Sequence, residues 1–162
     1  MTRKQQFIGL VGWLVATGIA AFLGSMASRR SEDFYGELVQ PSWAPPPDVF
    51  GPVWTVLYIL MAIAAWLVWR RGGFAHARTA LVLFLVQLVV NALWSWLFFA
   101  WRMGAAAFVD IALMWVLVAA TMAAFWRHSR LAAALLLPYL AWITFAGALN
   151  LRLWQLNPNI LG

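Results

Sequence analysis

The sequence predicts an all-α integral membrane protein: a bundle of five transmembrane helices with one long proline-rich loop between the first two. Hydrophobic residues make up 65% of the 162 residues and charged residues only 10%, whereas a soluble domain carries roughly 25% charged residues. Five apolar segments are each long enough to cross about 30 Å of hydrocarbon. Basic residues form short clusters between these segments, as membrane topology requires, so the net charge of +6 does not indicate nucleic-acid binding.

The five expected spans form one membrane domain over residues 1–162. Their approximate bounds are 6–27, 52–70, 79–101, 104–126 and 131–154. Three connections are short, whereas residues 28–51 form a long loop with four of the five acidic residues. Seven Lys and Arg residues fall on the side of the N-terminus and four on the other. The positive-inside rule therefore predicts a cytoplasmic N-terminus, with the loop and the C-terminus outside.

The first span carries a stripe of small residues at every fourth position. These residues are Gly12, Ala16, Ala20 and Gly24. Because small residues let helix backbones approach closely in lipid, this face is expected to touch another helix, with packing inside the bundle favoured over a dimer interface. The span is long enough to cross the membrane and no cleavage site follows it, so we expect a retained helix rather than a signal peptide.

Prolines shape the loop and the start of the second span. The loop prolines are Pro41, Pro45, Pro46 and Pro47. They fix φ and remove backbone donors, so the loop is expected to be stiff and non-helical. Pro52 lies in the first turn of the second span, where a helix tolerates proline, and Trp54 and Tyr58 follow one turn apart. A rigid aromatic segment at a helix entrance predicts the lip of a binding pocket, with residues 34–38 as a moving lid and 40–50 as a fixed wall.

Polar side chains follow one face of the third span. Gln87, Asn91 and Ser95 are spaced four residues apart, with Trp94 beside them. Single polar residues at membrane depth commonly form hydrogen bonds between helices, but three in register predict the lining of a cavity. Asp110 is the one acid inside a span. With no His or Lys beside it in the membrane, it is expected to be a hydrogen-bonded structural residue rather than part of a proton relay.

The 12 tryptophans divide into two groups. Five near span ends are expected at the membrane–water interface, and these are Trp66, Trp69, Trp101, Trp126 and Trp154. Four others accompany prolines, polar residues or small residues, and these are Trp43, Trp54, Trp94 and Trp142. Large rings with a single N–H donor suit a flat, mostly apolar ligand that is recognised by stacking.

Catalytic and metal-binding patterns are not visible. The chain has no cysteine, so it has no thiolate chemistry and no Cys-built metal site. His76 and His128 fall in connections at the end opposite the loop, so no imidazole is expected to bind haem iron in the pocket. Nucleophile–base pairs, phosphate loops and zinc-protease motifs are also missing. We expect no required cofactor and no metal.

Five stretches resemble one known family closely. PSWAPP, FGPVWTVLYILM, NALWSWLFF, LLPYLAWITFAGALN and WQLN are similar to the TspO family, also called translocator proteins, tryptophan-rich sensory proteins or peripheral-type benzodiazepine receptors. The resemblance covers nearly the whole chain and points to a bacterial member. It implies a generally dimeric five-helix protein of a bacterial cell membrane, inner or outer. It also implies an intramembrane pocket for porphyrins such as protoporphyrin IX and for benzodiazepine-site ligands.

The resemblance places the family's pocket among the five helices, beneath the first loop. The matching residues are Tyr35, Trp54, Tyr58, Asn91, Trp94, Ser95, Trp142 and Ala146. The favoured function is a receptor or sensor that binds tetrapyrroles and regulates porphyrin levels under stress. Tryptophans matching Trp54 and Trp142 are implicated in light- and oxygen-dependent porphyrin breakdown, so a porphyrin-degrading activity is one alternative. A transporter of porphyrins or other amphiphiles is another, although the sequence shows no inverted repeat or broken helix pair.

Two positions depart from the family pattern. Pro47 stands where the family often has glycine, which predicts a stiffer loop. The sterol motif requires a Lys or Arg soon after a tyrosine, and none of Tyr35, Tyr58 or Tyr139 has one within six residues downstream. Leu151 also stands where animal members have tyrosine. Cholesterol is therefore a doubtful partner.

Overall fold

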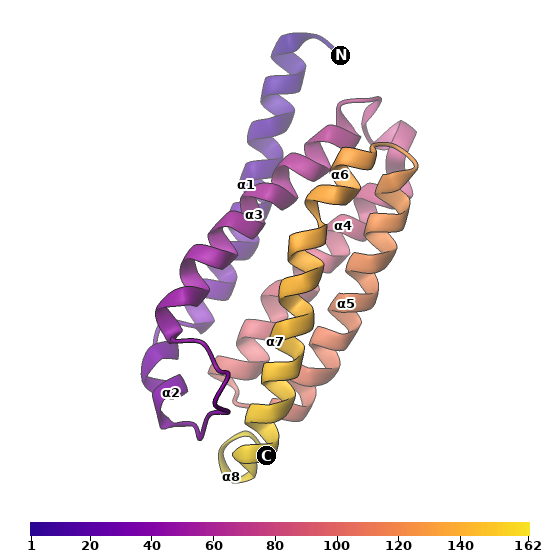
Figure 1. The fold of residues 1–162 in the computed structure, drawn as a ribbon. Helices are drawn as coiled ribbons and strands as arrows, with labels where there is room; N and C mark the ends of the chain where they lie inside the picture. The colour runs from indigo at the N-terminus through magenta and orange to yellow at the C-terminus, as the bar shows by residue number, and fades with distance from the viewer.

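Five long helical segments run up and down through the protein, and a computed structural model describes all of them, over residues 1–162 (Figure 1). They are α1 (Arg3–Ala27), α3 (Phe50–Trp69), α4 (Gly73–Ser95) continued by the π-helix η2 (Trp96–Ala100), α5 (Gly104–Trp126), and α6 (Arg130–Leu135) followed by α7 (Leu137–Leu156). Three short helices complete the fold: α2 (Ser31–Glu37), the 3-10 turn η1 (Pro47–Val49) and α8 (Pro158–Leu161). All five long segments are apolar enough to cross a membrane, which confirms an integral membrane protein with five spans.

The two ends of the bundle differ in charge. The N-terminus lies at one end, whereas α2, α8 and the C-terminus lie together at the other (Figure 1). The N-terminal end carries seven of the 11 Lys and Arg residues and none of the acids. This is the asymmetry that the positive-inside rule uses. The assignment of that end to the cytoplasm stays a prediction.

The loop between α1 and α3 is more helical than expected. Residues 31–37 form α2, and η1 begins at Pro47 itself. The expectation of a non-helical loop is therefore wrong over these residues. The reason is local: the first position of a helical turn needs no N–H donor, so proline is tolerated there. The fourth span matches its predicted bounds, 104–126, at both ends.

Two spans contain interruptions that the sequence analysis did not expect. The backbone of Ala77 in α4 is not helical (φ −132°, ψ 37°). The fifth span breaks between α6 and α7 because Pro138, in the first turn of α7, has no N–H to continue the hydrogen bonds of α6. Both breaks lie toward the N-terminal end of the bundle and neither lines the cavity described below. They therefore lack the placement of the broken helices that form transporter sites.

Helix α2 is firmly docked on the bundle. Phe34, Tyr35 and Leu38 are buried against Phe98 and residues of α7 in a small apolar core. Just after them, Val39 N–H donates to the side-chain oxygen of Asn157 (2.8 Å), and the Asn157 amide donates back to the Val39 carbonyl (2.9 Å). Asn157 is only 5% exposed. Residues 34–39 are thus fastened to the bundle in this state, and the division into a moving part at 34–38 and a fixed part at 40–50 stays a prediction.

Replacing Asn157 with alanine should loosen this fastening. We expect the Val39 amide to exchange its hydrogen about fivefold faster, because the N–H loses its protein acceptor and opens to water more often. Hydrogen–deuterium exchange resolved at residues 38–40 measures the effect. Asn159→Ala, at an exposed neighbouring position, is the control. Equal exchange in both variants would mean that the paired hydrogen bonds do not hold the loop.

Helix α1 contacts α3 through residues that the small-residue stripe did not identify. Ala20 and Gly24 are buried, but Gly12 is exposed and has open space around it. The prediction that the stripe faces a helix therefore holds for Ala16, Ala20 and Gly24 but not for Gly12. A Cβ on Gly9 would instead overlap the ring of Trp69, and Trp66 donates its indole N–H to the Gln6 carbonyl at 2.8 Å. These two tryptophans join helices rather than only facing lipid, because α1 begins at residue 3 and reaches their level.

Candidate ligand-binding site

A cavity of about 670 Å³ lies at the loop end of the bundle. Its walls come from α1, α2, η1, α3, α4, η2 and α7. Helix α5 contributes no residue, because it packs on α4 and α7 away from the cavity. The site thus lies among four of the five spans, not all five. Its volume is in the range of small-molecule sites, which hold roughly 300–1,000 Å³.

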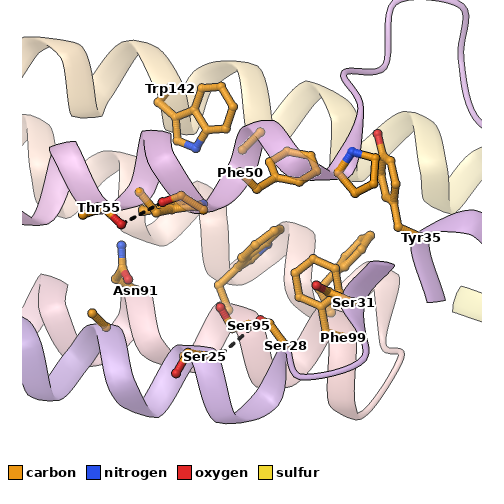
Figure 2. A pocket seen from close by; sticks show the side chains of 18 of the residues that line it. Ser25, Ser28, Ser31, Tyr35, Phe50, Thr55, Asn91, Ser95, Phe99 and Trp142 are labelled. Carbon is orange, nitrogen blue, oxygen red and sulfur yellow. Dashed lines mark hydrogen bonds between the residues drawn. The ribbon is translucent and has the colours of Figure 1, made fainter. Parts of the chain in front are cut away.

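All eight residues that the sequence analysis selected line this cavity. They are Tyr35, Trp54, Tyr58, Asn91, Trp94, Ser95, Trp142 and Ala146. Figure 2 shows Asn91 at one end of the cavity and Tyr35 at the other. Trp43, which was grouped with the pocket tryptophans, does not line it. Its ring is 47% exposed and packs edge-on against Phe145, at 5.7 Å between centroids.

Aromatic rings form much of the cavity wall. Trp54 and Tyr58 lie one turn apart on α3 with ring centroids 5.7 Å apart. Phe50, at the start of the same helix, meets Trp142 of α7 edge-on at 6.0 Å. On the α4 side, the ring of Trp94 stacks on Phe98 at 5.3 Å. Such walls offer flat apolar faces to a flat ligand.

Two of the cavity tryptophans differ in how their N–H groups are used. Trp94 donates to the side-chain oxygen of Asn150 at 3.0 Å, and Asn150 in turn donates to the Gly104 carbonyl at 3.1 Å. The Trp142 nitrogen is buried but has no hydrogen-bond partner, and Figure 2 shows it pointing toward the cavity. A buried unpaired donor costs roughly 1–3 kcal/mol. An acceptor on a bound ligand would remove this cost once the indole turns to expose its N–H, whereas Trp94 is already fixed in place.

A polar network forms the inner end of the cavity. Tyr58 donates its hydroxyl proton to the Asn91 side-chain oxygen (2.6 Å), and the Asn91 amide donates to the Tyr139 hydroxyl (2.8 Å). Tyr139 then donates to Gln87 at 2.7 Å. Only Tyr58 and Asn91 of this network reach the cavity, while Gln87 and Tyr139 are buried behind them. The prediction that Gln87 lines the cavity together with Asn91 and Ser95 is therefore wrong for Gln87. Because these side chains hold one another in place, the network makes this end rigid.

Tyr35 closes the opposite end. Its hydroxyl donates to the Pro45 carbonyl at 2.9 Å, and its ring meets Phe50 edge-on at 5.5 Å. Burial raises the pKa of Tyr35 above its ordinary value of 10.0, so the hydroxyl keeps its proton and remains a donor. Tyr35 therefore joins α2 to the proline segment across the mouth of the cavity.

Asp110 does not take the role that was predicted for it. The residue is 6% exposed, and one of its carboxyl oxygens is buried without a hydrogen-bond partner. The prediction of a hydrogen-bonded structural aspartate is therefore wrong. The side-chain donors of Asn91 and Tyr139, on neighbouring spans, form hydrogen bonds within their own network instead.

Several lining residues were missed by the sequence analysis. They include Gly24 and Ser25 near the end of α1 and Ser28 directly after it. Phe50 and Phe99 were also missed. A signal for two of them was available, because Gly24 belongs to the small-residue stripe and Ser28 continues it by one turn. Phe50 and Phe99 gave no such signal, since nothing in an apolar segment distinguishes a cavity-facing Phe from a core Phe.

The sequence profile of the TspO/MBR family matches residues 11–155. The chain belongs to this family. The match contains every residue that lines the cavity, from Ala21 to Leu153, but ends before Asn157.

The chain matches named relatives in the TspO/MBR family over nearly the full length of both proteins. The chain is 40% identical to the tryptophan-rich protein TspO of Chlorobaculum tepidum over 152 residues, which cover 91% of this chain and 93% of the relative. It is 39% identical to the translocator protein of Bos taurus, with 93% and 91% covered. It is 38% identical to protein CrtK of Rhodobacter capsulatus, with 91% and 90% covered. Bacterial and animal members of the family are thus about equally similar to it.

The two histidines of this TspO/MBR family chain lie together at the other end of the bundle, away from the cavity. The rings of His76 and His128 are 5.2 Å apart. Burial lowers the pKa of His128 from its ordinary 6.5, and the charges of His76, Arg71 and Arg127 lower it further. A lowered pKa means that the folded protein binds this proton less readily than the unfolded chain. This group therefore stabilises the fold above about pH 6.5 and loses that contribution as the pH falls below it.

Removing the neighbouring imidazole should raise the pKa of His128. We expect His76→Gln to shift the His128 titration to higher pH, because one positive charge no longer opposes its protonation. NMR titration of the histidine ring protons measures the midpoint. Arg78→Gln removes a charge that does not act on His128 and should leave it unchanged. A downward shift in His76→Gln would contradict the electrostatic coupling.

Proposed function

We propose that this TspO/MBR family member is a membrane receptor or sensor that binds a flat tetrapyrrole of the protoporphyrin IX type in the cavity. The unpaired N–H of Trp142, directed into an aromatic-walled space, is the observation that carries this proposal. It requires a ligand with a large apolar face and a hydrogen-bond acceptor near its centre or edge. A tetrapyrrole has both, through its macrocycle and its ring nitrogens. The names of the relatives, which include a tryptophan-rich sensory protein of Cereibacter sphaeroides, agree with a sensory role.

In this proposal the macrocycle lies between the two aromatic sides of the cavity. Trp54 and Trp142 present one side and Trp94 the other. The network of Tyr58 and Asn91 limits how far the ring enters, because its groups are already bonded to one another. The ligand is therefore held by shape and stacking, and a single donor orients it. Benzodiazepine-site ligands would use the same aromatic walls and compete with it.

Titration of the purified protein with protoporphyrin IX in the dark tests the proposal. Saturable binding at one site per chain should quench tryptophan fluorescence and shift the porphyrin absorption band. Protein-free lipid nanodiscs measure partition into the bilayer. The proposal would be refuted if the absorption shift and the quenching did not saturate and matched the partition of the porphyrin into the bilayer.

Light-dependent degradation of the porphyrin is the second candidate function. Its support is that Trp54 and Trp142 both line the cavity and so would both touch the ring. Repeating the titration under illumination, with oxygen, separates the two functions. An unchanged porphyrin spectrum after illumination would exclude degradation and leave the receptor function as the remaining candidate. A product spectrum that requires both tryptophans supports the degrader.

A further inference from the structure

A second cavity, of about 450 Å³, adjoins the ligand cavity at the loop end. It lies between the end of α1, helix α2 and the π-helix η2. Ser31 and Phe99 line both cavities, so the two share a wall. Figure 2 places these two residues at the same end of the ligand cavity as Ser28. The side chains of Ser31 and Phe99 therefore lie between the two cavities, and a ligand that occupies both would pass beside them.

The second cavity is lined by charged residues, unlike the first. Its charged residues are Arg29, Arg30, Asp33, Glu37 and Arg102. The one ion pair of the chain, Arg102 with Glu37 at 3.8 Å, is long and half exposed. Arg29 and Arg30 form no ion pair. The three arginines outnumber the carboxylates of Asp33 and Glu37, so the lining of this cavity carries a net positive charge.

Arg102 is held in an unusual position. Its φ of 53° is left-handed, which is uncommon for a residue other than glycine, and it follows directly on the π-helix and Trp101. The guanidinium lies 4.6 Å from the ring centroid of Phe34, which is only 3% exposed. Both π-helical turns and strained backbone occur often at functional sites. Here they direct a cation onto a fixed aromatic platform beside the cavity.

The charges of the two cavities would orient an anionic ligand. Glu32 and Asp48 line the first cavity, which has no basic residue, whereas in the second cavity the arginines outnumber the acids Asp33 and Glu37. Arg29, Arg30 and Arg102 lie across the shared wall. Guanidinium groups bind carboxylates strongly, because their planar donors match both oxygens. An amphiphile with a flat apolar ring and carboxylate side chains fits the pair of cavities in one orientation.

We propose that the second cavity binds the carboxylate side chains of the tetrapyrrole whose ring occupies the first cavity. Arg102 and the Arg29–Arg30 pair are then the residues that select acidic tetrapyrroles over neutral ones. This inference rests on the proposed function and specifies which ligands of that class the site prefers.

Comparison of protoporphyrin IX with its dimethyl ester tests the inference, because the ester keeps the ring but has no carboxylate. Affinities are measured in phosphatidylcholine nanodiscs for the wild type, Arg102→Gln, Arg102→Lys and the double variant Arg29→Gln/Arg30→Gln. We expect each glutamine variant to bind the acid about fivefold more weakly, as a partly exposed charge contact would predict. Arg102→Lys should retain part of the affinity. Binding of the ester should not change in any variant.

Arg127→Gln, at the far end of the bundle, is the matched control and should bind both ligands as the wild type does. An equal loss for acid and ester would show that the arginines support the fold or a lipid headgroup, and would overturn the inference. Unchanged binding of both ligands in every variant would also overturn it, while leaving the proposed function intact. Failure of the wild type to bind either ligand would instead refute the proposed function.

Discussion

Trp142→Ala should weaken protoporphyrin IX binding about thirtyfold. The indole ring forms one wall of the cavity and its N–H is the unpaired donor. Loss of such an aromatic anchor typically costs on the order of 2 kcal/mol, at about 1.4 kcal/mol per tenfold change in affinity. Fluorescence titration in nanodiscs measures the two dissociation constants.

Two further variants divide this effect into its parts. Trp142→Phe keeps a ring but removes the N–H, so its affinity for protoporphyrin IX should lie between those of the wild type and Trp142→Ala. Trp126→Ala removes a ring that is 56% exposed at the opposite end of the bundle, and should cost little. Trp66 would be a poor control, because its indole joins α3 to α1. Equal losses at positions 142 and 126 would show that the cavity tryptophan is not a ligand contact.

Asn91→Leu should lower the free energy of unfolding by about 2 kcal/mol. The change removes the acceptor of the Tyr58 hydroxyl and the amide that donates to Tyr139. Leucine fills a similar volume, so the loss comes mainly from unpaired polar groups. Hydrogen bonds between membrane helices contribute roughly 0.6 kcal/mol each, and up to about 1.7, and a buried group left without a partner costs more. Reversible unfolding in mixed detergent micelles measures the difference.

A double-mutant cycle tests whether the network accounts for this loss. Tyr58→Phe should lower the free energy of unfolding less in the Asn91→Leu background than in the wild type, because the Tyr58 hydroxyl has already lost its acceptor there. The same comparison applies to Tyr139→Phe. Costs that simply add would mean that Asn91 stabilises the protein through packing, not through the hydrogen bonds.

The family resemblance placed Tyr35 at the cavity, whereas the sequence pattern alone was sufficient to predict the number of spans and part of the cavity lining. Both follow from one-dimensional signals: the length of apolar runs, and the four-residue spacing that places Asn91 and Ser95 on one face of α4. Neighbouring prolines, polar residues and small residues selected Trp54 and Trp142 correctly, but the same criterion also selected Trp43, which does not line the cavity. For these features, the local pattern already contains the geometry.

What the sequence could not predict depends on contacts between distant segments. Asp110 lacks a partner because the donors of Asn91 and Tyr139 bond elsewhere, and no spacing along α5 reveals that. The docking of α2 depends on Asn157, 118 residues beyond Val39. The second cavity needs a left-handed Arg102 at the end of a π-helix, whereas the sequence there reads as an ordinary short connection.

The pairing of Val39 with Asn157 also has a consequence for biosynthesis. A ribosome adds roughly 5–20 residues per second, so the 118 residues that separate the two partners correspond to a delay on the order of ten seconds. During this interval the segment between α1 and α3 lacks the two hydrogen bonds to Asn157. The ligand site is therefore a late product of translation. A ribosome that stalls within α7 would leave a membrane-inserted chain whose loop is open to proteases.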